Sequence, residues 1–531
     1  MQITFIKQFT KKYLYKECSL IILALLIMLP FYFYKLSTLP TSVHGDETET
    51  AFQALQIIQG GAGLIGVGWF DLPLLSFLPH AFFMLLFGQT IIADRLGSII
   101  FGILVLPILY LLLKDFFDKR VAFVSTILLG TSHMWLALSR IGITYVQSTF
   151  FIASIVYILL KAFKTHKTIY FILGGAMFGL SLYSNFAVRI VPILTLVLFI
   201  HYFVTTKLTR KKILNITCFL VLAVIIFTPQ GSFYLKNPGT FSSRENSVFV
   251  FSKMAKEWTN YTNMSNAQII LTQTTRAFNI FAGDNSTQYG FKGQLLDYLS
   301  IFFFLVGVSY GALKVKYFRY QFMFFWLLLA ILGQIFTSIP PPIFLPRFVV
   351  GLPIIYLFIS IGILKGSEII SKLLIKHKYL HIIAILFIAC IVFWNIYTYF
   401  VIYPKQIDGD PNARSATKIG YYLNTLNKNY TAYFDTMPTI WAGYRLIQFI
   451  SPTGHKTDIT DSDLNNMART PNRINQIKEM SKVNDIAFVI YPEYNNSLKT
   501  LSNIFPNGQI ITFKEIDNSV QFYIFKLRTQ N

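Results

Sequence analysis

The sequence has 531 residues, of which 54% are hydrophobic and 13% charged, and its mean hydropathy is +0.53. This composition excludes an ordinary soluble protein and indicates a chain that crosses a membrane several times. The formal net charge of +22 does not indicate a nucleic-acid partner, because many basic residues lie in short clusters between apolar runs, where they set membrane topology.

The apolar segments predict a polytopic α-helical membrane protein with about eleven transmembrane helices, since a spanning helix needs about 20 residues. The segments are centred near residues 28, 102, 130, 154, 176, 196, 222, 305, 329, 355 and 391. The first, Leu20–Tyr34, resembles the core of a signal peptide but has no cleavage pattern after it. We therefore expect a retained signal anchor.

Lysine and arginine clusters fall in every second connection, which predicts a cytoplasmic N-terminus. The clusters are Lys7, Lys11, Lys12 and Lys16; Lys114, Lys119 and Arg120; Lys161, Lys164 and Lys167; Lys207, Arg210, Lys211 and Lys212; Lys314, Lys316 and Arg319; and Lys365, Lys372, Lys376 and Lys378. An odd number of spans then places the C-terminal part outside. We expect a multi-pass protein of the plasma (inner) membrane.

The charge pattern holds only if Leu72–Gly88 does not cross the bilayer, although about 17 of its residues form an apolar run. Pro73, Pro79 and His80 interrupt this run. We therefore predict an interfacial or re-entrant segment within one external loop, residues 40–90.

The chain divides into a transmembrane domain, residues 1–403, and a soluble extracytoplasmic domain, residues 404–531. A second long external loop, residues 231–294, is expected to contain short helices. After residue 403 the charge rises, and runs at 431–434, 485–491, 509–513 and 520–526 read as strands, with a helical stretch at 472–482. These runs predict a small α/β domain.

The external loop 40–90 begins with an acidic cluster, Asp46, Glu47 and Glu49. Apolar residues recur at helical spacing over 51–58, so we expect an amphipathic helix at the membrane edge with the carboxylates in its first turn. Paired carboxylates there suit general-base catalysis or binding of a divalent metal. The alternative is that the Asp46-x-x-Glu49 pattern caps the helix.

Three arginines, Arg140, Arg189 and Arg347, lie at the outer ends of predicted spans, where basic residues are otherwise scarce. A guanidinium group matches a phosphate with paired hydrogen bonds, so we predict that these residues bind a lipid-linked phosphate. The alternative is that each arginine reaches ordinary lipid head groups.

Further polar residues are auxiliary candidates for the same site: His44, His80, His133 and Tyr145. A histidine there could supply a ligand or a proton, but each histidine taken singly is more often structural or interfacial.

Several motifs occur in an order that resembles a known superfamily. They are His44-Gly45-Asp46-Glu47, Trp69 to Leu75, Leu86-Phe87-Gly88, Arg95-Leu96, Ser139-Arg140-Ile141, Gly179-Leu180, Arg189 to Pro192 and, more loosely, Pro346-Arg347-Phe348 to Pro353. Together they resemble the polyprenyl-phosphate-sugar-dependent glycosyltransferases of the C-type superfamily, family 39 in particular. That family contains the protein O-mannosyltransferases, and the lipid A aminoarabinose transferases are relatives. The resemblance covers the membrane part but not the C-terminal domain.

The resemblance implies an inverting transfer of a sugar from a polyprenyl phosphate to an acceptor hydroxyl on a protein, lipid or glycan, at the non-cytoplasmic face. It makes Asp46 the catalytic carboxylate, with Glu47 beside it, and it implies membrane-parallel helices in the first external loop. Asp46 would take the acceptor proton while arginines stabilise the departing phosphate, Arg189 and Arg347 ahead of Arg140.

The sequence also departs from the family pattern. Some members carry a second Asp where this chain has Ile143-Thr144-Tyr145, which argues against a two-carboxylate metal site. If a divalent metal binds, Asp46 and Glu47 are its expected ligands, and no other cofactor is expected. The Trp-Trp-Asp signature of oligosaccharyltransferases is missing, so transfer to asparagine is not expected.

Two other functions fit a membrane protein of this kind. A transporter or flippase of lipid-linked saccharide would need polar groups near the midplane and often two similar halves. A non-catalytic scaffold in envelope assembly would use the C-terminal domain as its binding module.

Overall fold

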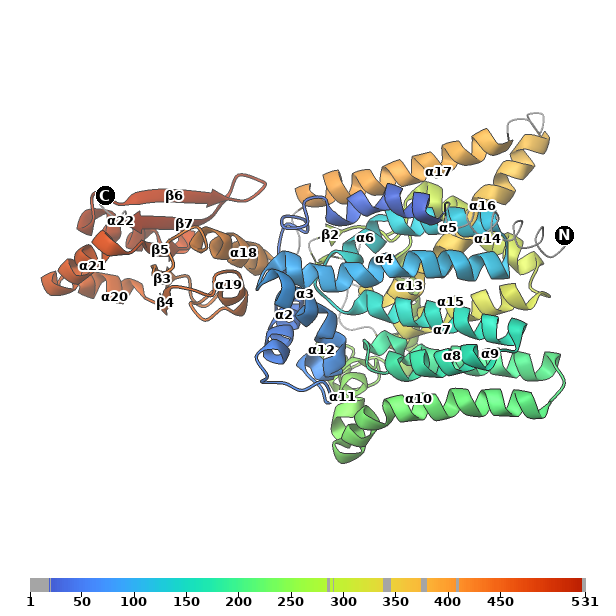
Figure 1. The fold of residues 1–531 in the computed structure, drawn as a ribbon. Coiled ribbons are helices and arrows are strands. Elements are labelled where there is room, and N and C mark those ends of the chain that lie inside the picture. The colour runs from blue at the N-terminus through green and yellow to red at the C-terminus, as the bar shows by residue number, and fades with distance from the viewer. Residues whose placement is uncertain are drawn as a thin grey trace, which may run out of the picture.

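The computed structural model describes residues 19, 21–283, 287–289, 291–337, 345–373, 380–406 and 410–527. It shows a helical bundle with a small domain built on a sheet at one of its ends (Figure 1). The predicted class, a polytopic α-helical membrane protein with a small C-terminal domain, is confirmed. The lysines of the first basic cluster, 7–16, and Lys376 and Lys378 lie outside the described residues.

Seven helices of the described residues are long and apolar enough to cross a membrane. They are α4 (Ile91–Phe116), α7 (Tyr145–Thr165), α9 (Val191–Thr205) with its preceding turn η3 (Phe186–Ile190), α10 (Arg210–Lys236), α15 (Phe318–Phe336), α16 (Leu352–Leu373) and α17 (Leu380–Tyr397). Shorter apolar helices cover Ile21–Phe33, α8 (Thr168–Ser181) and α14 (Tyr298–Leu313).

Two further helices, α5 (Lys119–Thr131) and α6 (His133–Ser139), meet at an angle of 61° and are long and apolar enough for a span only when taken together. The break falls at Ser132, whose backbone is extended and whose side chain accepts a hydrogen bond from the Trp135 N–H at 3.1 Å. Each of the eleven predicted segments is therefore helical in the structure.

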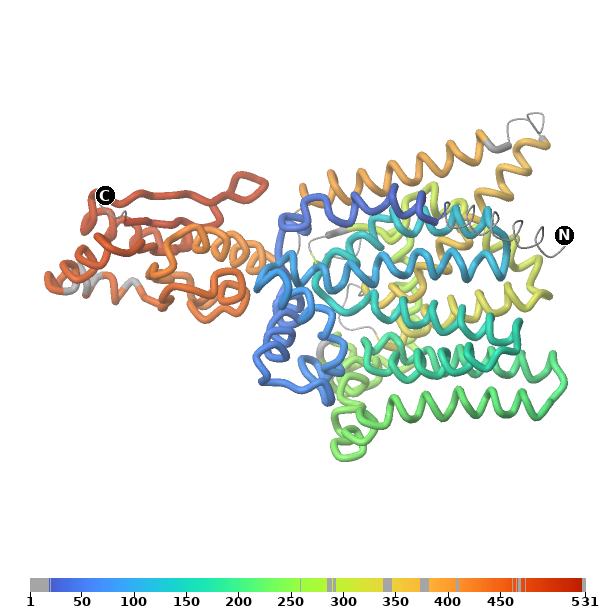
Figure 2. Tube along the Cα trace, in the orientation of Figure 1, coloured from blue at the N-terminus to red at the C-terminus, as the bar shows by residue number. Residues whose placement is uncertain are grey.

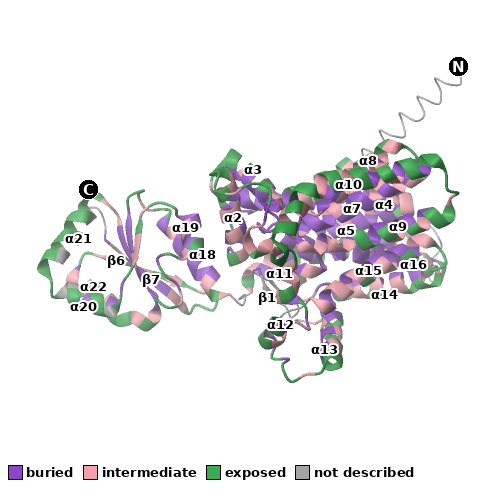
Figure 3. Cartoon of the chain, turned by 90° about the horizontal axis from the view of Figure 1, so that it is seen from below, coloured by how far each residue is buried: buried purple, intermediate pink, exposed green. Residues whose placement is uncertain are grey.

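The outer helices of the bundle present apolar side chains to the surroundings, as a bilayer requires. Only 22% of the apolar part of α10 is buried, against 67% for α16, and Val221, Val224 and Ile225 of α10 are exposed. Buried residues concentrate inside the bundle, while the outer helices carry the exposed ones (Figure 3).

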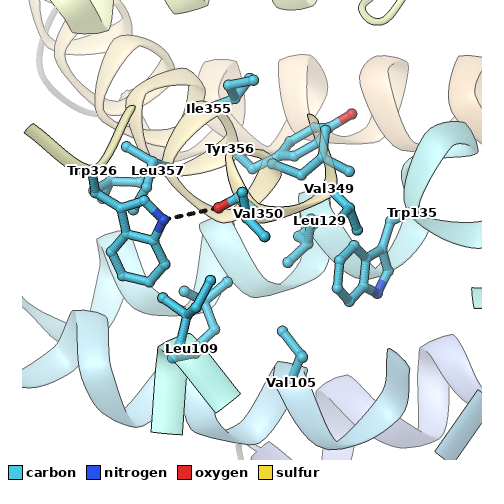
Figure 4. Packing of buried hydrophobic residues seen from close by; sticks show 14 of the residues in the cluster. Val105, Leu109, Leu129, Trp135, Trp326, Val349, Val350, Ile355, Tyr356 and Leu357 are labelled. Carbon is cyan, nitrogen blue, oxygen red and sulfur yellow. Dashed lines mark hydrogen bonds between the residues drawn. The ribbon is translucent and has the colours of Figure 1, made fainter. Parts of the chain in front are cut away.

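Glycines let α14 and α16 approach closely inside the bundle. A Cβ on Gly307 would lie 1.8 Å from the Phe358 carbonyl oxygen, and one on Gly362 would lie 1.9 Å from that of Phe303. Around α16 the core packs large apolar side chains, and the Trp326 indole donates to the Val350 carbonyl at 2.9 Å (Figure 4). The middle of the bundle is therefore tightly packed.

The first loop forms two helices across one end of the bundle, α2 (Gly45–Ile58) and α3 (Leu78–Phe87) (Figure 1). The ten residues of α3 extend about 15 Å, half the thickness of the hydrocarbon core, so α3 is too short to span it. One face of α3 buries His80, Ala81 and Met84. This geometry supports the predicted interfacial segment.

The second loop begins later than predicted, because α10 continues to Lys236. The loop then contains the expected short helices and, in addition, a two-stranded hairpin. These elements are α11 (Pro238–Val248), α12 (Lys253–Trp258), α13 (Asn266–Asn279), β1 (Thr287–Gln288) and β2 (Phe291–Lys292).

The C-terminal domain contains a five-stranded mixed sheet with strand order β4-β3-β5-β7-β6. Strands β3 (Thr431–Asp435), β4 (His455–Asp458) and β5 (Ile486–Ile490) are parallel, whereas β6 (Gln509–Lys514) and β7 (Val520–Leu527) are antiparallel to their neighbours. The helices are α18 (Pro411–Leu423), α19 (Arg445–Ile450), α20 (Asp461–Ala468), α21 (Pro471–Val483) and α22 (Asn495–Ile504). The edge strand β4 was not predicted because its four residues, His-Lys-Thr-Asp, have no apolar alternation.

The C-terminal domain shares a hydrophobic core with the first loop. Buried Ala51 and Ala54 of α2 belong to the same cluster as Leu446 and Phe449 of α19. The chain leaves α17 and enters this domain at the end of the bundle that also carries α2, α3 and α11 (Figure 2). The predicted second domain is therefore docked on the acidic loop.

Candidate active site

Asp46 is the second residue of α2 and is only partly buried. The helix is capped by His44, whose Nδ1 accepts the Asp46 N–H at 3.1 Å. The Asp46 carboxylate instead accepts the Tyr289 hydroxyl at 2.7 Å. The side chain therefore does not cap the helix, and it remains available for other chemistry.

Asp46 lines a cavity of about 270 Å³ between the first loop, the second loop and the bundle. The same cavity is lined by the predicted residues Tyr145, Arg189 and Arg347, which come from three different segments of the bundle. The structure thus brings four of the predicted site residues together around one space.

Arg189 is held at the cavity wall by contacts on several sides. Its guanidinium forms an ion pair with Glu245, donates to the Phe241 carbonyl at 2.9 Å and lies within 4.7 Å of the ring centres of Phe186 and Phe241. Asn185, which accepts the Ala187 N–H at 3.2 Å, shapes the turn that carries Arg189. The arginine is therefore positioned before any ligand binds.

Arg244 is a further cation of the cavity, and the sequence reasoning missed it. It lies 4.6 Å from the ring centre of Phe70, and its neighbour Ser243 donates to the carboxylate of Asp71. Phe70 and Asp71 have φ values of 54° and 57°, a conformation that non-glycine residues rarely adopt without support from their surroundings. The contacts from α11 supply this support.

Arg347 precedes α16, and its pKa is affected by Arg244, another cation of the cavity. Burial, followed by the like charge of Arg244, lowers the pKa of Arg347 to about 10, so Arg347 is still protonated at neutral pH. Two guanidinium groups that repel each other at a cavity wall are stabilised when an anion binds between them. The cavity therefore favours a phosphate-like ligand.

Tyr289 is the second residue that sequence reasoning did not assign to the site. Burial, and then the charge of Asp46, raise the pKa of Tyr289 well above its usual value, so its hydroxyl stays neutral and donates. The Tyr145 hydroxyl lies 3.1 Å from that of Tyr289. Tyr289 and Arg244 both lie in the long second loop, where residue spacing gives no signal of proximity to Asp46.

Glu47 does not line the cavity, although it follows Asp46 directly. It is 1% exposed and its two carboxylate oxygens accept Arg95 Nε at 2.7 Å and Nη2 at 3.2 Å. The N–H of Gly142 also donates to it, at 3.0 Å. Glu47 therefore ties α2 to α4 and to the turn after α6, which corrects its expected place beside the reacting groups.

Arg140 also lies away from the cavity. It is fully buried, donates to the carbonyls of Phe31 and Tyr34, the latter at 2.6 Å, and stacks on Phe400 at 5.2 Å. These carbonyls belong to the end of the first apolar helix and the turn after it, where no intrahelical donor remains. The structure thus gives Arg140 a packing position instead of the expected phosphate contact.

The candidate histidines have structural contacts. His44 caps α2 and packs edge-on against Tyr289, with ring centres 4.7 Å apart. His80 is buried and its Nδ1 lies 2.9 Å from a carboxylate oxygen of Asp94. His133 bonds Asn395 and the Gln294 carbonyl. Of the three, His44 lies beside Asp46.

A metal site built on Asp46 and Glu47 does not fit this arrangement, because Glu47 is committed to Arg95 and Gly142. Among the residues that the structure describes, no group of three or more His, Cys, Asp and Glu side chains is placed to hold a metal ion.

Comparisons with known proteins agree with this architecture. Residues 71–233 match the family described as dolichyl-phosphate-mannose-protein mannosyltransferase, a range that contains Tyr145 and Arg189 but not Asp46. No curated protein matches the sequence significantly.

Solved structures with a similar fold include ArnT from Cupriavidus metallidurans. The form bound to undecaprenyl phosphate has a TM-score of 0.53 at 13% identity, and the match covers 95% of this chain and 97% of that one. The apo form gives 0.52, also at 13% identity, over 97% and 99%. The oligosaccharyltransferase of Archaeoglobus fulgidus gives 0.46 at 13% identity, over 96% of this chain and 74% of that one. The likeness to ArnT shows a shared fold.

Proposed function

From the premise that this membrane protein has a C-type glycosyltransferase fold with a family 39-like segment, we propose that it transfers a sugar from a polyprenyl-phosphate-linked donor to an acceptor hydroxyl. The observation that carries the proposal is the single cavity that Asp46, Arg189, Arg244 and Arg347 all line. A carboxylate and a group of cations around one space are what this reaction requires.

In the proposed reaction Asp46 takes the proton of the acceptor hydroxyl. The oxygen of that hydroxyl attacks the anomeric carbon of the donor sugar at the same time. The bond from that carbon to the phosphate oxygen breaks, and the polyprenyl phosphate leaves with the electron pair. Attack from the side opposite to the leaving group inverts the anomeric carbon. The acceptor hydroxyl would replace the Tyr289 hydroxyl as hydrogen-bond donor to Asp46.

The arginines stabilise the negative charge that grows on the departing phosphate. Arg347 and Arg244 are the arginines most stabilised by the phosphate charge, because this charge offsets the repulsion between their guanidinium groups. The partners are the lipid-linked donor, a protein, lipid or glycan acceptor, and the bilayer itself. The ArnT form with undecaprenyl phosphate supports the donor class.

We place the reaction at the non-cytoplasmic face of the plasma membrane. The distribution of lysines and arginines supports this orientation, because the end of the bundle with Asp46 carries few basic clusters. The C-terminal domain, docked on α2, is then extracytoplasmic.

The test is sugar transfer by purified Asp46→Asn protein with labelled polyprenyl-phosphate sugars. We expect a loss of about a hundredfold or more, as for removal of a general base. Glu257→Gln is the matched control, because Glu257 is an exposed carboxylate of the second loop. Full activity of Asp46→Asn would refute the mechanism. Movement of the intact donor across a vesicle membrane would indicate a transporter. Absence of both sugar transfer and donor movement would indicate a scaffold.

A further inference from the structure

A second cavity, of about 300 Å³, lies at the end of the bundle opposite to Asp46. Its polar lining comprises Asp118, Arg120, Tyr310, Arg319, Tyr320, Lys365 and Glu368. Arg347 precedes α16 beside the first cavity, and Lys365 follows it by 18 residues along that helix, on the order of 25 Å away. This cavity is therefore separate from the candidate active site.

The two carboxylates of the second cavity are already engaged. Asp118 accepts the N–H groups of Arg120 and Val121 at 2.8 and 3.1 Å, which caps α5. Glu368 lies between two lysines, accepting Lys365 at 3.0 Å and Lys372 at 3.1 Å. With these acids counted, the lining still carries a net positive charge, because Arg120, Arg319 and Lys365 outnumber Asp118 and Glu368.

Arg319 is held in place but incompletely bonded. Its guanidinium carbon lies 5.3–5.6 Å from the ring centres of Phe117, Tyr317 and Tyr320, and Nη1 donates to the Phe116 carbonyl at 3.3 Å. Its Nε is buried and has no acceptor among the residues that the structure describes. The guanidinium of Arg319 also lines the cavity, so an anion there would form charge-assisted hydrogen bonds with the accessible end of this group.

Two helices begin at this cavity, α5 at Lys119 and α15 at Phe318. No side chain caps the start of α15. The uncapped N-terminus of α15 carries partial positive charge and free N–H groups, so it adds to the attraction for an anion, whereas Asp118 occupies N–H groups at the start of α5. The remaining wall is apolar, with Val121, Ile361, Leu364 and Ala384.

We propose that this second cavity binds a phosphate-bearing anion, with Arg319 as the central ligand and Arg120 at the entrance. The basic rim and apolar wall suit the head group of an anionic phospholipid, and a soluble phosphate offers the same chemistry. The site is independent of the proposed sugar transfer. The lysine and arginine clusters that set topology thus also converge on a binding site.

The experiment measures thermal unfolding of the detergent-solubilised protein with added phosphatidylglycerol, phosphatidylcholine or inorganic phosphate. We expect phosphatidylglycerol to raise the Tm of wild type and phosphatidylcholine to leave it unchanged. Arg319→Gln is expected to weaken the response to phosphatidylglycerol at least about tenfold in lipid concentration. Lys316→Gln is the matched control, because Lys316 lies beside the same helix start but does not line the cavity.

The outcomes separate the sources of the anion. A response to inorganic phosphate as strong as that to phosphatidylglycerol, and lost in Arg319→Gln, supports the site with a soluble ligand. The proposal would be overturned if phosphatidylglycerol raised the Tm of wild type and Arg319→Gln equally. It would also be overturned if Lys316→Gln lost the Tm response as fully as Arg319→Gln. Arg319→Lys is the second variant, to be used if Arg319→Gln folds poorly. It keeps the charge but not the paired N–H donors of a guanidinium, so its Tm should respond to phosphatidylglycerol only in part. Asp46→Asn should respond as wild type, whatever its transfer activity.

Discussion

At the scale of single residues, Asp46 and Glu47 are neighbours in sequence with opposite surroundings. Successive residues of a helix point about 100° apart, so the first carboxylate reaches the cavity while the second turns into the protein. The buried one needs a counter-charge, which Arg95 provides with two hydrogen bonds. The two carboxylates should therefore respond differently to mutation.

Glu47→Ala should lower the free energy of unfolding by about 3–5 kcal/mol, because it leaves the Arg95 guanidinium buried without its partner. Thermal unfolding in detergent measures this effect. The double variant Glu47→Met with Arg95→Met should recover part of the loss. An inactive Glu47→Gln protein as stable as wild type would contradict this structural role.

Arg347→Gln should raise the KM for the lipid-linked donor about tenfold or more, since it removes a cation that lines the cavity. Arg140→Gln should leave that KM unchanged and lower the Tm, because Arg140 bonds backbone carbonyls near the end of the first apolar helix. Steady-state kinetics on both variants distinguish the two roles. An unchanged KM in Arg347→Gln would count against its place in donor binding.

At the scale of elements, the contact between α14 and α16 depends on the absence of side chains. Backbone carbonyls of each helix lie where a Cβ of the facing glycine would be. Such close packing is typical of helices in membranes, where small residues permit van der Waals contact between backbones. Hydropathy predicted both helices, but it gave no sign of this contact.

Gly307→Ala should destabilise the bundle by about 1–3 kcal/mol, because the new methyl group would lie 1.8 Å from the Phe358 carbonyl oxygen. The measurement is the Tm in detergent. Gly333→Ala is the matched control, since nothing lies within 4 Å of a Cβ there. Equal Tm values for the two variants would show that the helices separate without cost.

At the scale of the whole molecule, the C-terminal domain stabilises the helix that carries Asp46. Arg445 forms an ion pair with Glu49 at 2.6 Å and lies 4.4 Å from the ring centre of Phe52. The Gln89 side chain donates to the Phe449 carbonyl at 3.0 Å. The domain therefore acts on the candidate active site through α2.

Phe449→Ala should increase amide hydrogen exchange in residues 45–58, because Phe449 is buried in the core shared by α19 and α2. Truncating a buried phenylalanine to alanine typically lowers the free energy of unfolding by about 3–5 kcal/mol. Val483→Ala, at a position 76% exposed, should leave the exchange unchanged. Unchanged exchange of α2 in Phe449→Ala would show that α2 is held by the bundle alone.

Much of the fold followed from local pattern. The apolar segments, the amphipathic acidic helix and four of the five strands of the C-terminal sheet were predicted, since segment length and periodicity report how much of each element is buried. For the site, Asp46, Tyr145, Arg189 and Arg347 were predicted and line one cavity.

Sequence by itself determined the class of this protein, because a bilayer demands long apolar helices and places charges at their ends. Only the tertiary structure decided which charged groups meet. Asp46 and Tyr289 are 243 residues apart in the chain, and Glu47 turns away from the cavity that its neighbour lines. Such contacts depend on how helices pack and rotate against one another, which no local pattern of residues specifies.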